Sequence, residues 1–341
     1  MFDFLDRARD LLRLKTPGVV QAQKELEDVF NAISDLQGVH SKSYLDLNNI
    51  EIVFGAIEMA LLLRKLGTRD YKDVKKLRDS LITLIFKTLE HSIKFPVEQG
   101  HIVPPAPYKQ FMEVLASALK NQPSQDPHEF AFITFNYDLC LDQALHFSGV
   151  RYDYFLNTPE KPSVVPLLKL HGSINWGQYQ ASPGELVIEP WPISQVNFNA
   201  VSHVPHVFYN LGSNMNGIGL GGGITLQGPP IIVPPTWNKD SYHGQLSNVW
   251  AAAAHQLSTA QNIIVIGYSL PETDSFFRYL YALGSESATQ IRNFVVIDPD
   301  PTDKVFPRFR TLIGRGIESR FRPLRATFWD GLGTIRTILN S

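Results

Sequence analysis

Four short segments of the chain carry polar or ionisable side chains, two of them together with glycine, and each follows a run of apolar residues. They are residues 136–138 (NYD), 171–173 (HGS), 267–271 (GYSLP) and 298–300 (DPD). A histidine such as His171 titrates near neutral pH and suits proton transfer. A glycine such as Gly267 lets the backbone approach a ligand closely. These four segments are therefore the candidates for a functional site.

The apolar runs that precede the four segments predict the strands that position them. These predicted strands are residues 130–135, 167–170, 263–266 and 294–297. Helical patterns lie between them, at about 138–147, 246–257 and 275–283. On the last of these helices, the residues expected to face inward are Phe276, Tyr279, Leu280 and Leu283. This alternation predicts an α/β fold with a mostly parallel sheet, in which ligands bind at the carboxyl ends of the strands.

The rest of the chain divides into a helical region and an insert. Residues 1–122 predict helices, because apolar residues recur at helical spacing near 2–12, 26–33, 53–63, 77–89 and 111–119. We expect the third of these stretches, 53–63, to be the most buried. Residues 123–341 form the predicted second domain. Within it, residues 177–242 are rich in Pro and Gly and weakly periodic, which predicts a functional insert or lid.

Composition excludes several classes of protein. Among 341 residues, 31 Lys and Arg nearly balance 33 Asp and Glu, so no basic field indicates nucleic acid binding. The apolar runs are too short to predict a membrane span. Cys140 is the one cysteine, which excludes an internal disulfide and any metal site with two thiolates. His203 and His206 are three residues apart but offer no third ligand, so we predict no metal. We also predict a cytoplasmic protein.

In their order along the chain, the four segments resemble the sirtuin-like NAD-consuming domains, and more closely the zinc-free bacterial branch used in anti-phage defence. The matching stretches are 132–138 (FITFNYD), 169–176 (KLHGSINW), 264–274 (IVIGYSLPETD) and 295–298 (VVID). The resemblance extends roughly from residue 126 to the C-terminus. It implies a Rossmann-like, doubly wound, mostly parallel sheet with an N-terminal helical bundle. It also implies hydrolysis of NAD+ rather than protein deacetylation, since the deacetylating branch holds zinc with four cysteines.

The resemblance implies a role for each candidate residue. His171 matches the general base that acts on the ribose hydroxyls, Asn136 matches the residue that positions ribose and water, and Asp138 lies near the nicotinamide carboxamide. The residues implied to contact NAD+ elsewhere are Gly172, Gly267, Ser269 and Asp298. The resemblance further implies a homo-oligomer, or a partner protein of a defence system, and no metal.

Each of these residues also has a structural interpretation. His171 could be a buried structural histidine, and Asn136 could simply shape a turn. Asp138 could cap the helix that follows it. Gly267 and Asp298 could each serve a tight turn at the end of a strand.

The chain departs from the family at one motif. Relatives open with a strand and a Gly-Ala-Gly-x-Ser loop that contacts the pyrophosphate, and no Gly-Ala-Gly occurs in this sequence. We therefore expect that this strand and loop either lie upstream of the sequence or are missing from the protein. The departure favours a second candidate function, a nucleotide-sensing or assembly module without turnover.

Overall fold

A computed structural model describes residues 4–14, 17–38, 43–98, 101–120, 130–158, 164–182, 185–191, 209–210, 230–233, 243–272, 274–284 and 289–340. It is a mixed α/β protein with parallel sheets, as the sequence predicts. The chain forms two compact units. Unit 1 comprises residues 1–103, 135–139 and 171–245, and unit 2 comprises 104–134, 140–170 and 246–341. The two units thus alternate along the chain. The domain boundary predicted between residues 122 and 123 stays a prediction.

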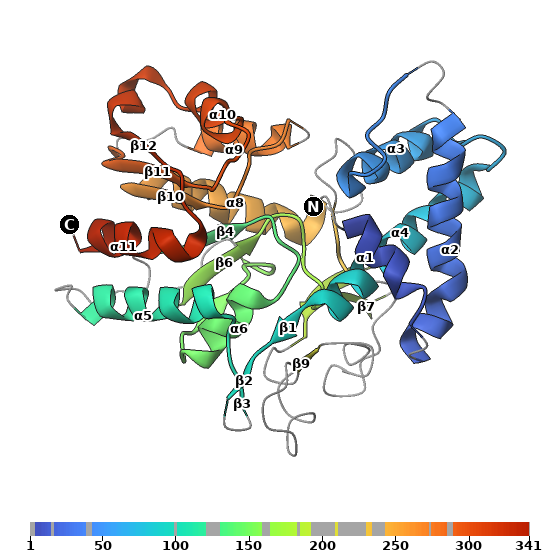
Figure 1. Ribbon diagram of the computed structural model, residues 1–341, viewed down its shortest axis with the longest axis horizontal. Helices are drawn as coiled ribbons and strands as arrows, with labels where there is room; N and C mark the ends of the chain where they lie inside the picture. Colours follow the sequence, from blue (N-terminus) through green and yellow to red (C-terminus); the bar gives the residue numbers. More distant parts are fainter. Residues whose placement is uncertain are drawn as a thin grey trace. The chain divides into compact units, whose positions relative to one another are not determined.

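Unit 1 contains the four N-terminal helices, α1 (Phe4–Leu11), α2 (Pro17–Gln37), α3 (Ile50–Leu62) and α4 (Tyr71–Ser92) (Figure 1). Their starts follow from the sequence. Pro17 occupies the first turn of α2, where its missing N–H costs nothing. Asn49 caps α3 by accepting a hydrogen bond from the Glu51 amide, and Asp70 caps α4 in the same way. The helices α1, α2 and α3 all contact α4, which supplies much of the apolar core.

Short antiparallel strands complete unit 1. The strand β1 (Lys94–Phe95) pairs with β9 (Tyr209–Asn210), and β2 (Val97–Glu98) pairs with β3 (His101–Ile102). The predicted insert begins with a hairpin of β7 (Trp176–Ser182) and β8 (Glu185–Pro190). The Gly-rich run at 217–222 and the histidines 203 and 206 lie outside the described residues.

Unit 2 contains two parallel sheets of three strands each. The first has the order β4-β6-β5, formed by β4 (Phe132–Thr134), β6 (Val165–Lys169) and β5 (Tyr152–Asp153). The second has the order β10-β11-β12, formed by β10 (Asn262–Ile266), β11 (Asn293–Ile297) and β12 (Phe321–Leu324). The central strand of each sheet is the most buried, which explains the mainly apolar residues of β6 and β11. The four predicted strands are confirmed.

Further helices lie before, between and after these strands. They are α5 (Ala106–Lys120), α6 (Cys140–Phe147), α8 (His243–Thr259), α9 (Ser275–Gly284), α10 (Val305–Leu312), the 3-10 helix η6 (Arg315–Arg320) and α11 (Phe328–Leu339). The α5 and α11 helices meet through Phe328, whose ring contacts those of Tyr108 and Phe111. Among the described helices, none has both the length and the apolar character required to cross a membrane.

The predicted inward face of α9 is wrong. Tyr279 and Leu283 are 58% and 75% exposed, whereas Phe277 and Tyr281 are buried. The ring of Tyr281 packs edge-on against Phe294 of β11, with ring centroids 5.8 Å apart. Aromatic residues at neighbouring positions gave two overlapping helical series, and the contact with β11 selects the one shifted by one residue.

Candidate functional site

The first two candidate segments leave the ends of neighbouring parallel strands. The strands β4 and β6 pair with Thr134 opposite Lys169. One residue further along, the Leu170 amide donates a hydrogen bond to the Thr134 carbonyl at 3.0 Å. The segments that follow both strands belong to unit 1, where residues 135–139 and the segment from His171 onward fold together. The pairing of β4 with β6 therefore brings these two segments together.

His171 is buried at 5% exposure between two aromatic rings. The centroid of its imidazole lies 5.2 Å from that of Phe135, edge-on, and 6.4 Å from that of Tyr137. Its carbonyl accepts a hydrogen bond from the Val233 amide at 2.8 Å. Asn136 lies between these two aromatic residues in the sequence and is exposed. The structure thus brings the turn of Asn136 against His171.

Asp138 follows in the same turn and is half-buried. The helix α6 begins at Cys140, so Asp138 lies two residues before the first helical residue. Cys140 itself is half-buried.

A buried polar network, which the sequence did not identify, holds the two segments together. The Ile174 amide donates to the Tyr137 carbonyl at 3.0 Å, which fastens the 171–176 segment to the Asn136 turn. The Ser173 hydroxyl donates to the Asn175 side-chain oxygen at 2.7 Å. The Asn175 side-chain amide donates to the Trp191 carbonyl at 3.0 Å, and Ser173 and Asn175 are fully buried. Ser173 and Asn175, which alternate with the apolar residues Ile174 and Trp176, were the available signal.

Gly172 has a steric role in unit 1. Its φ is +86°, a left-handed conformation that favours glycine. A Cβ atom at this position would lie 2.1 Å from the carbonyl oxygen of Ile231. That carbonyl accepts a hydrogen bond from the Ser173 amide at 2.9 Å, and Gly172 forms a β-bridge with Ile232. The glycine lets segment 230–233 approach His171, while its contact with NAD+ stays a prediction.

In unit 2, the turn after β10 presents an exposed backbone. Gly267 has a φ of +62° and its amide donates to the Ile297 carbonyl at 2.9 Å. A Cβ at Gly267 would meet no atom within 4 Å, so the space beside this backbone is open. Ser269 is exposed as well, and its carbonyl accepts a hydrogen bond from Arg308 at 3.2 Å. The open space at Gly267 and the guanidinium of Arg308 at the same turn leave room and positive charge for a phosphate.

Asp298 shapes the turn that follows β11. Its carboxylate accepts a hydrogen bond from the Asp300 amide at 2.8 Å, and its own amide donates to the Leu324 carbonyl of β12 at 3.1 Å. At 9% exposure the side chain is largely buried. These contacts are those expected from the strand-end interpretation of Asp298.

Asp300 anchors the start of α10 in the same turn. Its carboxylate oxygens accept hydrogen bonds from the amides of Lys304 at 3.0 Å and Val305 at 2.9 Å. Burial raises the pKa of this carboxyl, but the hydrogen bonds from the amides of α10 outweigh burial and leave its pKa below the ordinary 3.8.

The lowered pKa of Asp300 predicts a pH-dependent contribution to stability. A carboxyl with a depressed folded-state pKa stabilises the fold fully above its unfolded pKa, and this contribution fades as the pH falls through the folded value. We expect Asp300→Asn to melt several degrees below the wild type at pH 7, and the difference to shrink below about pH 3.8. The matched control is Asp46→Asn, since Asp46 accepts a hydrogen bond from the exposed Asn48 amide. A difference in melting temperature that is constant with pH would contradict this assignment.

A buried ion pair lies immediately before His171 in the sequence. The Lys169 ammonium at the end of β6 is 3.0 Å from Asp142 of α6, and both side chains are 1% exposed. The Tyr154 hydroxyl donates to the other oxygen of Asp142. Burial and the charge of Asp142 raise the pKa of Tyr152. A hydrogen bond with Tyr154 partly offsets this rise. This network joins β6, the α6 helix and the segment that follows β5 within unit 2.

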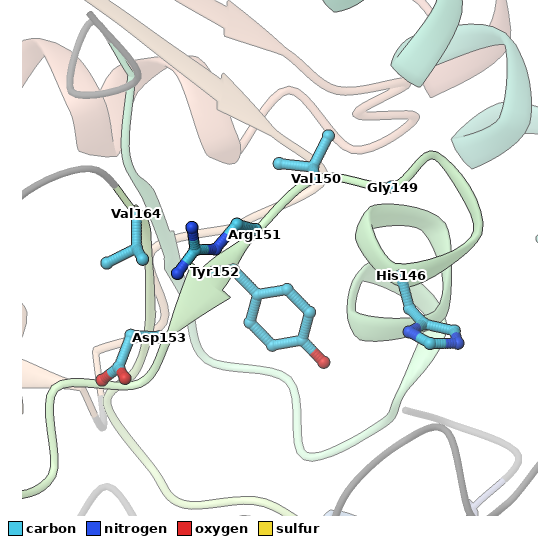
Figure 2. A pocket seen from close by; sticks show the side chains of 7 residues that line it. All are labelled: His146, Gly149, Val150, Arg151, Tyr152, Asp153 and Val164. Carbon is cyan, nitrogen blue, oxygen red and sulfur yellow. The ribbon is translucent and has the colours of Figure 1, made fainter.

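Two cavities lie away from the predicted residues. One of about 480 Å³ opens beside β5 and is lined by His146, Gly149, Val150, Arg151, Tyr152, Asp153 and Val164. Figure 2 shows the Tyr152 side chain extending from β5 toward the helix that carries His146. The other, of about 550 Å³, is lined by Gln261, Thr289, Gln290, Ile291, Arg292 and Arg320. Neither cavity includes a candidate residue. Within the described part of the chain, no group of three or more His, Cys, Asp or Glu is placed to hold a metal ion.

Comparison with protein-family models and with curated proteins finds no match to this chain.

Proposed function

We propose that the protein hydrolyses NAD+ to ADP-ribose and nicotinamide, on a Rossmann-like, doubly wound arrangement of its parallel strands. The observation that carries this proposal is the position of His171. It follows β6 next to the turn after β4, and the residues on both sides of Asn136 contact its imidazole. A histidine and an amide at the carboxyl ends of adjacent parallel strands are well placed to act on a bound ligand.

The proposed reaction breaks the bond between C1 of the ribose and the nicotinamide nitrogen. The bonding electron pair leaves with the nicotinamide, which departs neutral because its ring was cationic. Water forms the new bond to C1, and His171 accepts the proton that this water loses. Asn136, whose side chain is exposed, would position the ribose and the water, and Asp138 would lie on the nicotinamide side.

For unit 2, considered by itself, the proposal assigns the further contacts with NAD+ that the resemblance implies. The open backbone at Gly267 suits the pyrophosphate, and Arg308, which donates to the carbonyl of Ser269, adds a positive charge to that turn. Ser269 would contact the adenosine ribose, and Asp298 would lie near the adenosine. Gly172 is retained in this proposal as the residue that shapes the backbone at His171.

The direct test is the loss of NAD+ catalysed by the purified protein. Removing a general base costs on the order of 100- to 10,000-fold in rate, so we expect that loss for His171→Ala. We expect on the order of a 100-fold loss for Asn136→Ala, which removes a positioning group. His255→Ala is the matched control, since His255 is exposed on α8 and has no assigned role. Equal background rates in the wild type and both site variants would refute the enzyme proposal.

A second candidate function is binding of the nucleotide without turnover. The 5% exposure of His171 favours it, because a buried imidazole has limited access to water and substrate. A rise in melting temperature with NAD+ or ADP-ribose, without hydrolysis, would select this function. In either case we propose a cytoplasmic protein that acts in a bacterial defence system, as a homo-oligomer or with a partner protein.

A further inference from the structure

The helix α3 is apolar on two opposite faces. One face is buried against α4 and includes Val53, Phe54 and Ile57. The same side carries Glu58, which is 4% exposed and lies 2.7 Å from Arg78 of α4. These contacts fix the orientation of α3 within unit 1. The opposite face therefore points away from the helices that hold it.

That opposite face carries a continuous apolar stripe. At 100° per residue, six apolar or small residues fall within a 120° arc. They are Ile52, Gly55, Ala56, Met59, Leu62 and Leu63, which we call the α3 stripe. Met59, Leu62 and Leu63 are 53%, 58% and 67% exposed, and the other three are half-buried. The sequence predicted this stretch to be the most buried of the N-terminal helices, so its exposure in the single chain is a departure from that prediction.

The charges at the two ends of α3 indicate what covers the stripe. Glu51 lies in the first turn of the helix, and Arg64 and Lys65 follow its last turn. A second α3 related by a two-fold axis perpendicular to the helix runs antiparallel, so its basic end lies beside the acidic start of the first. Pairing Glu51 with Arg64 also sets Ile52 opposite Leu63 and Ala56 opposite Met59. Small Ala56 then faces large Met59 at the centre of a contact about 20 Å long.

We propose that the α3 stripe is the interface between two copies of this chain, paired antiparallel through α3. An exposed apolar stripe of this kind is unusual on a monomer and typical of an association surface. The charges at its ends are self-complementary, which a two-fold interface requires. This inference is independent of the NAD+ hydrolysis proposed above, because all of its residues lie on the N-terminal helices.

Sedimentation velocity tests the proposal. The wild type should sediment with the mass of two chains as its concentration rises from about 1 to 100 µM, a range that brackets a micromolar dissociation constant. We expect Met59→Glu to raise the dissociation constant at least about tenfold, because it places a charge at the centre of the stripe. The matched control is Leu283→Glu, an exposed leucine on α9 outside the stripe, and it should associate like the wild type. Melting curves recorded by circular dichroism verify that both variants fold.

Charge reversal tests the antiparallel register. Glu51→Arg and Arg64→Glu should each weaken the dimer several-fold, and the double variant should restore it. A wild type that remains a single chain at every concentration overturns the proposal and leaves the stripe to a different protein. A dimer that Met59→Glu leaves intact overturns it as well. A dimer that is not restored by the double reversal overturns the antiparallel pairing.

Discussion

Replacing Lys169 with methionine should lower the free energy of unfolding of unit 2 by about 3–5 kcal/mol, the typical cost of removing one partner from a buried ion pair. Methionine fills a similar volume but leaves the Asp142 carboxylate buried without its cation. Lys169 and Asp142 are each 1% exposed, so water cannot replace the lost partner. The Tyr154 hydroxyl still donates to Asp142, but it carries no charge to balance the carboxylate.

An exposed pair of the same length provides the control for Lys169. Arg9 and Asp6 of α1 are also 3.0 Å apart, but their side chains are 50% and 73% exposed. Arg9→Met should therefore cost less than about 1 kcal/mol. Urea denaturation followed by circular dichroism and tryptophan fluorescence measures both variants. Similar losses for Lys169→Met and Arg9→Met would contradict the importance of burial at β6.

The second large effect is expected from Gly172→Ala. Holding a non-glycine residue at a φ of +86° costs about 1–3 kcal/mol. The added Cβ would also lie 2.1 Å from the Ile231 carbonyl, which must move away. That movement breaks its hydrogen bond with the Ser173 amide and leaves a buried amide unsatisfied, at a further cost of about 1–3 kcal/mol. We expect a lower melting temperature and faster proteolysis of unit 1, measured against the wild type.

Gly267→Ala separates the two parts of that cost. Its φ of +62° is also left-handed, but a Cβ there meets no atom within 4 Å. The variant should therefore show the backbone cost alone, about 1–2 kcal/mol. If Gly267 also contacts NAD+, this variant loses nucleotide affinity while keeping most of its stability. Equal destabilisation by the two alanines would show that the Ile231 carbonyl yields without cost.

The strands that lead into the site could be predicted because each contains a short continuous apolar run, although only β6 and β11 are largely buried. The runs before Asn136, His171, Gly267 and Asp298 are short and apolar, and all four form parallel strands. By contrast, β12 contains Arg322 and Pro323 and lies at the edge of its sheet, so its sequence carries no strand pattern. The hairpin of β7 and β8 was likewise hidden inside a stretch that composition marked as an insert.

The surroundings of the candidate residues could be predicted only in part. The neighbours of His171 within the turn after β4 follow from the strand order, and the structure places them as expected. The contacts that fix Ser173 and Asn175 come from Ile231 and Trp191, which are distant in sequence. Arg308 and Ser269, which form a hydrogen bond, are likewise far apart in the sequence. No local pattern encodes such contacts, because they depend on how distant segments pack.

The hydrogen bonds around Asn175 and Trp176 also join segments of unit 1 that are distant in the sequence. The Trp191 amide donates to the Asn175 carbonyl at 2.7 Å, and the Ile231 amide donates to the Trp176 carbonyl at 2.8 Å. Trp191 and Ile231, which are distant in sequence, are thus held at two adjacent residues of the segment that follows His171. Changes of sequence between them that keep these two hydrogen bonds are therefore expected to leave the backbone around His171 unaltered. The fold therefore tolerates sequence variation close to His171, its most chemically capable residue.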